Sequence, residues 1–258
     1  MITALISRKG GVGKTTTTVN LAAALAEKGH SVLLVDLDSQ ASASLSLGVK
    51  REELAPSAAD VLLSGTPAKQ VIRPTAIDGL DLITASVDLI DADAQLGVFR
   101  GRDLRLRSAL EPVVPAYEFI LIDCPSSLSI LPANALVAAD TFIVPSTPHY
   151  LAVTGVRNLI AAAARLSWDA GARLRPLGIL LTMVDYRTKL TRRTVDQIRS
   201  EYGPLVFAIE VRINTRLAEA PEAGQTIFQY DPRAKGAEAY RLLADEYLLR
   251  CAEAGRRG

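Results

Sequence analysis

The fold of this chain is decided by a glycine-rich stretch near its start, Arg8-Lys9-Gly10-Gly11-Val12-Gly13-Lys14-Thr15-Thr16. An apolar run at residues 2–6 precedes it, and a helical pattern at residues 16–28 follows it. A strand, a glycine-rich loop and a helix start in this order are the context of a phosphate-binding loop. The glycines let successive N–H groups point at an anion, and the helix N-terminus adds partial positive charge. The stretch therefore predicts a nucleotide site.

Two side chains of this loop carry the expected chemistry. Lys14 is the point charge for the β- and γ-phosphates, and the Thr15 hydroxyl is placed to bind Mg²⁺. Arg8 stands where the general pattern G-x-x-x-x-G-K-[ST] has its first glycine, so the strict pattern is not met. A glycine-rich turn with solvated lysines is the alternative, and the strand–helix context disfavours it. The residues expected to line the nucleotide are Lys9, Gly10, Gly11, Val12, Gly13, Lys14, Thr15 and Thr16.

Composition favours one domain over residues 1–258. A chain of 258 residues with 49% apolar residues can bury a full core. Aromatic residues make up only 5%, so Ala, Val, Leu and Ile must build that core, which suits parallel strands covered on both faces. The net charge is +1, so any contact with nucleic acid must come from a local patch.

The compartment expected from the sequence is the cytoplasm. Cys124 and Cys251 are the only cysteines, which argues against a disulfide framework, and we expect Cys124 to be a small buried packing residue. No apolar run approaches the ~20 residues that a transmembrane helix needs. The apolar start of the chain, residues 1–6, is too short for a signal peptide and runs directly into the glycine-rich stretch.

Acidic side chains follow two predicted strands where each strand ends. Residues 31–36 read as a strand ending on Asp36, with Asp38 two residues later, and residues 117–123 as a strand ending on Asp123. In open α/β sheets such carboxylates project into the crevice where ligands bind. Asp36 and Asp38 are therefore candidates for handling metal and water, although either could instead cap the next helix. Asp123 has the form of a Walker B aspartate, which holds Mg²⁺.

The remaining pattern predicts a doubly wound α/β fold, with a mostly parallel sheet and helices on both faces. Residues 80–84 alternate as an edge strand does. Ser57 and Asp60 resemble a capping box at the start of a short helix over 57–64. The other expected strands are 141–145 and 177–183, and the other expected helices are 151–167 and 237–253.

Two groups of basic residues could contact nucleic acid. Between Arg187 and Arg216, seven basic residues stand against three acidic ones, a local excess of +4 that suits sequence-independent phosphate contact. An ordinary solvated helix is the alternative. An earlier run, 100–107, is read as a solvated helix face because acidic and leucine residues interrupt its four arginines. The candidate DNA-binding residues are Arg187, Lys189, Arg192, Arg193, Arg199 and Arg216, extended by Arg233 and Lys235.

Four separated motifs, in the same order, resemble those of the ParA/MinD ATPases with a deviant Walker A loop. The resemblance makes Lys9 the lysine that reaches across a nucleotide-sandwich dimer. Residues 36–40 resemble the family's D-x-D-P-Q element, with Ser39 in place of the proline. That match implies that Asp38 positions or activates the attacking water and that Asp36 supports the magnesium shell.

The second half of the chain continues the resemblance. Residues 124–128 are similar to the family's second switch, with Ser126 in place of a proline, and residues 214–221 are similar to its C-terminal signature. The resemblance places Asn214 near the adenine base, together with Met183. Nothing near Cys124 supplies the further thiolates of an iron–sulfur site, which disfavours the related nitrogenase iron protein.

The resemblance implies an ATPase that uses ATP and Mg²⁺ and closes into a homodimer around ATP. Such a dimer would bind DNA nonspecifically, lie on the nucleoid in the cytoplasm, and partition DNA or position another cargo. A ParB-like partner would stimulate hydrolysis. One alternative is a MinD-like regulator that cycles on membranes. It is disfavoured because the C-terminal end, residues 251–258, lacks the bulky apolar face of an interfacial membrane helix, so no membrane partner is expected. The other is a small-molecule P-loop enzyme, such as a dethiobiotin-synthetase-like ligase.

Overall fold

The computed structural model describes residues 1–126, 129–149, 152–171 and 174–256. Within these ranges one eight-stranded sheet has the order β3-β4-β2-β5-β1-β6-β7-β8. All neighbouring strands pair in parallel except β3, which runs antiparallel to β4. The strands are β1 (Ile2–Leu5), β2 (Val32–Asp36), β3 (Arg73–Pro74), β4 (Leu80–Ile83), β5 (Phe119–Asp123), β6 (Thr141–Ser146), β7 (Arg175–Val184) and β8 (Val211–Arg212).

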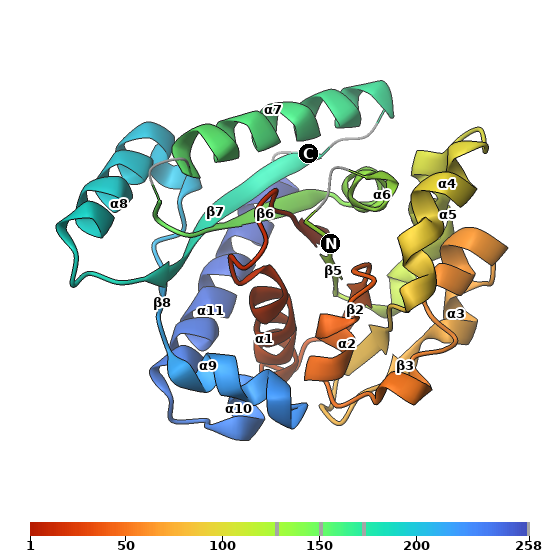
Figure 1. Cartoon of the computed structure of the whole chain (residues 1–258), viewed down its shortest axis with the longest axis horizontal. Helices are drawn as coiled ribbons and strands as arrows, with labels where there is room; N and C mark the ends of the chain where they lie inside the picture. Colours follow the sequence, from red (N-terminus) through yellow and green to blue (C-terminus); the bar gives the residue numbers. More distant parts are fainter. Residues whose placement is uncertain (127–128, 150–151, 172–173, 257–258) are drawn as a thin grey trace.

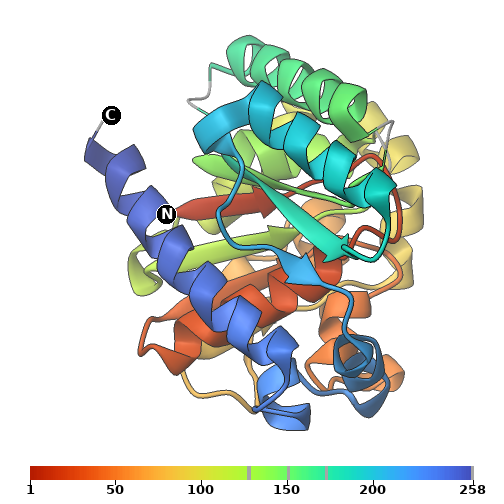
Figure 2. The same cartoon turned by 90° about the vertical axis from the view of Figure 1, so that its left-hand side faces the viewer.

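Helices cover both faces of the sheet (Figure 1), which confirms the predicted doubly wound α/β fold. Helices α1 and α11 lie side by side on one face, and α6 and α7 lie on the other (Figures 1 and 2). The α-helices are α1 (Lys14–Glu27), α2 (Ser42–Ser46), α3 (Ala68–Val71), α4 (Ala92–Gly97), α5 (Arg105–Leu110), α6 (Ile130–Ala138), α7 (Ala152–Asp169), α8 (Lys189–Tyr202), α9 (Thr215–Glu219), α10 (Ile227–Tyr230) and α11 (Lys235–Arg256).

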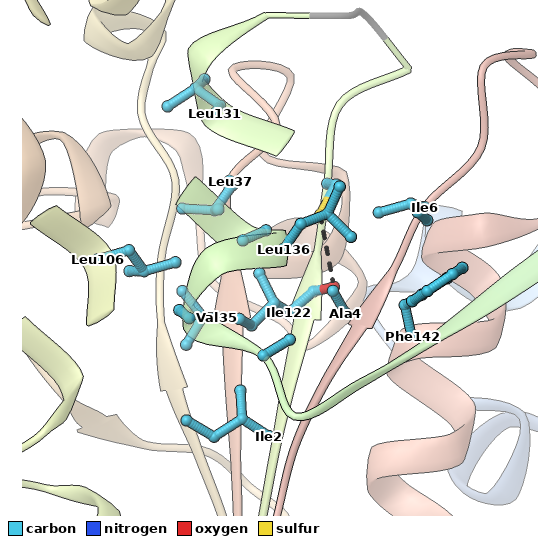
Figure 3. Close-up of a cluster of buried hydrophobic side chains, with 14 of the residues drawn as sticks. Ile2, Ala4, Ile6, Val35, Leu37, Leu106, Ile122, Leu131, Leu136 and Phe142 are labelled. Carbon is cyan, nitrogen blue, oxygen red and sulfur yellow. Dashed lines mark hydrogen bonds between the residues drawn. The ribbon is translucent and has the colours of Figure 1, made fainter. Parts of the chain in front are cut away.

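The strand residues divide between two buried clusters because successive side chains point to opposite faces. In β2, Leu33 and Val35 join the cluster under α5, α6 and α7, whereas Val32 and Leu34 join the cluster under α1 and α11. Figure 3 shows the first cluster, where side chains of β1, β2 and β5 meet leucines of α5 and α6. Both faces are buried, which explains why the strands read as continuous apolar runs.

Two local predictions need correction. Residues 80–83 do not form the edge strand, because Arg73 and Pro74 pair antiparallel with Leu82 and Asp81 and so form the edge themselves. The first helix begins at Lys14, two residues earlier than the pattern indicated, because Gly13 takes up the left-handed conformation that starts it.

The short helix expected over 57–64 is a single wide turn, Asp60–Ser64. The predicted contact at its start is present: Asp60 Oδ2 accepts a hydrogen bond from the Ser57 N–H at 2.7 Å. None of the described helices combines the length and the apolar character needed to cross a bilayer.

Candidate nucleotide-binding site

The glycine-rich loop connects β1 to α1 at the carboxyl edge of the parallel strands. Gly11 and Gly13 have φ of 69° and 76°, which side chains with a Cβ rarely adopt. These two positions therefore explain why the loop needs glycine.

Hydrogen bonds hold this loop in shape from two sides. Thr182 Oγ1 donates to the Val12 carbonyl at 2.7 Å, and Thr17 Oγ1 donates to the Gly13 carbonyl at 2.7 Å. The Thr17 hydroxyl also lies 3.2 Å from the buried Tyr240 hydroxyl of α11. The loop is thus connected to β7 on one side and to the C-terminal helix on the other.

The Lys14, Thr15 and Asp123 side chains meet at the start of α1. Lys14 is 6% exposed, and its Nζ lies 3.5 Å from Asp123 Oδ1. Thr15 Oγ1 donates to Asp123 Oδ2 at 2.7 Å, and Thr18 Oγ1 donates to Asp123 Oδ1 at 2.9 Å. The structure therefore brings together the ammonium, hydroxyl and carboxylate that the sequence places more than 100 residues apart.

Asp36 lies beside Asp123, because the two residues are register partners on β2 and β5. Asp36 is fully buried, and its Oδ2 accepts from both the N–H and the hydroxyl of Ser44, at 2.9 and 2.7 Å. Its Oδ1 accepts from the Asp38 N–H at 3.1 Å. Asp36 thus binds the first turn of α2, which was the alternative expectation for it, and it also lies next to Asp123, the candidate metal ligand.

Burial governs the ionisation of these groups. Burial, and then the neighbouring Asp123 carboxylate, raise the pKa of Asp36 to about 7. Burial likewise raises the pKa of Asp123, against the opposing effect of Lys14. Burial disfavours the Lys14 ammonium, but the surrounding carboxylates, Asp123 first, outweigh it and raise the pKa of Lys14. Two adjacent buried carboxylates, one of them paired with Lys14, therefore lie at the start of α1.

The pKa of Asp36 predicts a pH dependence of stability. Its native pKa lies above the ordinary value of 3.8, so the folded chain holds a proton that the unfolded chain releases. This stabilisation is present at low pH and is lost as pH rises through about 7. Without nucleotide and Mg²⁺, we expect the Tm to fall between about pH 4 and about pH 7, and Asp36→Asn to flatten that slope. An Asp36→Asn protein whose Tm keeps the same slope in calorimetry would contradict this.

The site offers oxygen ligands that suit Mg²⁺. The Thr15 hydroxyl and the Asp123 carboxylate are hard donors already in contact with each other. The described residues contain no group of three or more His, Cys, Asp or Glu side chains that could hold a metal. Mg²⁺ commonly takes one or two protein ligands and completes its shell with phosphates and water, so the donor set fits it.

Met183 is the next-to-last residue of β7, and Asn214 lies two residues after the end of the neighbouring strand β8, so both are at the same edge of the sheet. Met183 has φ of 51°, unusual for a residue with a side chain, and its Cε lies 3.8 Å from where a Cβ on Gly13 would be. Asn214 Oδ1 caps α9 by accepting from the N–H groups of Arg216 and Leu217. Met183 therefore lies against the loop, whereas the Asn214 carbonyl oxygen already serves the fold.

Lys9 is exposed at the mouth of the loop, where its N–H donates to Ser7 Oγ at 3.3 Å. It lines a cavity of about 430 Å³ together with Arg8 and His149. Lys9 forms no ion pair within the described ranges, in contrast to Lys14, so its ammonium is available to a ligand outside its own loop. Ser126 lies at the edge of the described residues, and the rest of the predicted second switch, 127–128, falls outside them.

Sequence comparison identifies relatives over the whole length. Residues 1–174 match the AAA domain family. The chromosome-partitioning ATPase Soj of Thermus thermophilus is 44% identical over 97% of this chain and 96% of its own length. The sporulation initiation inhibitor protein Soj of Bacillus subtilis is 39% identical over 95% and 97%. The chain belongs to the ParA/Soj family of partitioning ATPases.

Solved structures agree with this assignment to the ParA/Soj family. A Mycobacterium smegmatis structure with bound ADP and magnesium, named cobyrinic acid a,c-diamide synthase, superposes with a TM-score of 0.84. It is 34% identical and covers 98% of this chain and 96% of its own. The fold seen here is therefore one in which ADP and magnesium have been observed bound.

The candidate DNA-binding residues of this ParA/Soj chain differ in whether they already pair with an acidic side chain. Lys189, Arg192 and Arg193 are exposed on α8 and make no ion pair with a described acid. Arg199 instead points at β8, where it pairs with Glu210 at 2.7 Å and donates to two backbone carbonyls. Arg187 pairs with Asp185, and Arg216 pairs with Glu219. The expected single stripe of Lys189, Arg192, Arg193 and Arg199 therefore loses its last member.

Sequence reasoning missed Thr18 and Ser44. Thr18 donates to Asp123, and Ser44 holds Asp36 and also accepts from the Ala85 N–H at 3.2 Å. The signal for Thr18 was available, because it lies on the same side of α1 as Thr15, the metal-ligand candidate. Ser44 could not be singled out among the serines of residues 39–46 without knowing the path of the loop.

Proposed function

We propose that this chain is a Mg²⁺-dependent ATPase whose ATP-bound homodimer binds DNA nonspecifically and partitions DNA or positions another cargo. The contact of Lys14 and Thr15 with Asp123 carries this proposal, because it joins a phosphate-binding cation to a metal-binding pair. The name of the Thermus thermophilus relative supports ATP hydrolysis and chromosome partitioning. The magnesium and ADP of the Mycobacterium smegmatis structure support the ligand assignment.

Each side chain has a role in this proposal. Lys14 holds the β- and γ-phosphates, Thr15 and Asp123 hold Mg²⁺, and Asp36 supports the magnesium shell from beside Asp123. Bound Mg²⁺ would neutralise charge on the phosphates. Asp38 orients the attacking water, and Lys9 reaches the nucleotide of the second copy. A ParB-like partner stimulates the reaction, and residues 1–258 act as one domain on the nucleoid.

Asp38→Ala tests the hydrolytic role. Asp38 is half-buried, and its carboxylate accepts only from the Gln40 N–H among the described residues, so its loss should leave the loop folded. We expect ATP binding to persist, hydrolysis to fall by about 10²-fold or more, and the ATP dimer to accumulate. Light scattering after ATP addition and a phosphate-release assay measure both. Normal turnover in this variant would remove Asp38 from the mechanism.

The DNA contact is tested by Arg192→Ala/Arg193→Ala. Both arginines are exposed, so we expect weaker binding to duplex DNA and a salt dependence reduced by about two phosphate contacts. The matched control is Arg187→Ala/Arg216→Ala, because each of these arginines already pairs with an acid. Fluorescence anisotropy at several salt concentrations gives both slopes. Equal losses in the two variants, or binding insensitive to salt, would refute the assignment to α8.

The name of the Mycobacterium smegmatis structure favours a second candidate, an amide-forming enzyme that acts on a small carboxylic acid. Turnover measured with cobyrinic acid and ammonia or glutamine distinguishes the two. Amide formation without any effect of DNA would support the enzyme. Turnover that needs no such substrate and responds to DNA would support the partitioning ATPase.

A further inference from the structure

A surface that is both apolar and basic lies around α5, at the opposite end of the molecule from α8 (Figure 1). Three large apolar side chains there remain exposed: Val98 by 83%, Phe99 by 48% and Leu104 by 40%. We call this the α5 surface. It comprises Val98, Phe99 and Leu104 with the basic residues Lys69, Arg100, Arg102, Arg105 and Arg107.

The basic side chains of the α5 surface lie on a stretch of chain that also carries Asp93, Asp103 and Glu111. Within the described ranges none of its five basic side chains pairs with a carboxylate, and Asp103 is the acid within the arginine run. A groove of about 420 Å³ lies here, with Lys69 and Arg105 among its cations and Pro67, Leu104 and Val113 among its apolar walls. Cations beside apolar walls are complementary to a segment that carries both acidic and apolar side chains.

A solvated helix face explains the arginines but not Val98 and Phe99. The Arg105 guanidinium lies 5.0 Å from the centre of the Phe99 ring, so one cation is already positioned against the apolar part of the surface. A nucleic-acid backbone would use the positive charge but would leave these two apolar side chains without a partner. The combination therefore favours a protein segment over DNA.

Hydrogen bonds connect the α5 surface to helix α6. The fully buried Asn134 of α6 donates to the Arg102 carbonyl at 3.0 Å and accepts from the Leu106 N–H at 3.1 Å. Asp93 of α4 accepts from the Ile130 N–H at 2.7 Å, at the first residue of α6. Helix α6 begins seven residues after Asp123 in the chain. A shift of α5 would therefore be transmitted to α6.

We propose that the α5 surface binds an acidic, amphipathic segment of a partner protein, and that binding acts on the nucleotide site through Asn134 and α6. The binding itself goes beyond the proposed function and does not depend on it. The effect on turnover rests on the proposed ATPase activity.

The test selects peptides with the full-length chain. Random displayed peptides, long enough for about four helical turns, are selected on the wild-type protein. Counter-selection uses Val98→Ser/Phe99→Ser and, separately, Arg105→Glu. We expect the retained peptides to share acidic residues with apolar ones at helical spacing, and a synthetic copy to lose at least about tenfold in affinity for either variant. The controls are Trp168→Ser and Arg165→Glu on α7, which are 86% and 87% exposed and should bind as the wild type does.

Three outcomes would overturn the proposal: retained peptides that are basic or share no composition, peptides that the two α5 variants bind unchanged, or duplex DNA binding that Arg105→Glu abolishes. Each variant's Tm is measured, so that loss of folding is not mistaken for loss of binding. ATP turnover is then measured with and without the synthetic peptide. If the peptide changes ATP turnover of the wild type but not of Asn134→Ala, and binds both with the same affinity, the route through α6 is supported. Absence of any turnover would count against the ATPase and not against the binding surface.

Discussion

Lys14→Ala is expected to lower the rate of ATP hydrolysis by about 10²–10³-fold, because it removes a buried cation at the start of α1 where phosphate charge develops. Asp123 then loses its charged partner at 3.5 Å while its hydrogen bonds from Thr15 and Thr18 remain. The protein should therefore stay folded. Phosphate release at saturating ATP and Mg²⁺ measures the loss.

The control for this experiment is Lys50→Ala. Lys50 is 75% exposed, and its contact with Glu53 is long, at 4.0 Å, so its removal should leave turnover unchanged. Calorimetry of the Lys14 variant separates lost catalysis from lost stability. Turnover within a few-fold of wild type in a folded Lys14→Ala protein would show that the loop does not bind phosphate as proposed.

Lys9→Ala is expected to abolish the ATP-dependent dimer. Lys9 is exposed and makes no ion pair within the described ranges, so its removal should cost the isolated chain almost nothing in stability. In the proposed sandwich the same ammonium would lie against the second copy's phosphates. Light scattering with ATP and Mg²⁺ should then report a monomer where the wild type forms a dimer.

The sharpest form of this experiment uses Asp38→Ala as the background. That substitution should block hydrolysis and so keep the protein in its ATP-bound dimer. A Lys9→Ala/Asp38→Ala protein that stays monomeric has therefore failed to associate, because rapid ATP hydrolysis is excluded as the cause. Lys50→Ala/Asp38→Ala is the matched control and should remain dimeric. A dimer of undiminished affinity in the Lys9 double variant would refute the role across the interface.

The sequence predicted the fold and the central contacts because each depends on a local pattern. Strands ending on Asp36 and Asp123 had to meet at one edge of a parallel sheet, and the register places these two residues side by side. The glycine pattern predicted the loop, and its two left-handed glycines lie where the chain turns into α1.

What the sequence did not predict depends on tertiary packing. Helical spacing put Arg199 with Arg192 and Arg193, but Glu210 and the carbonyls of the neighbouring loop draw Arg199 inward. The edge strand was missed because β3 has only two residues, one of them proline, and gives no periodic signal. The left-handed backbone of Met183 and the hydrogen bonds from Ser44 to Asp36 also had no recognisable pattern in the sequence.

The bracing of the glycine-rich loop by Thr182 and Tyr240 has a thermodynamic consequence. A loop already held in shape by hydrogen bonds to β7 and α11 loses little conformational entropy when it binds a triphosphate. Capture of the phosphates should therefore be quick and carry a modest entropic penalty. Truncation of α11 before Tyr240 would remove this support and make the glycine-rich loop, near the other end of the sequence, more flexible.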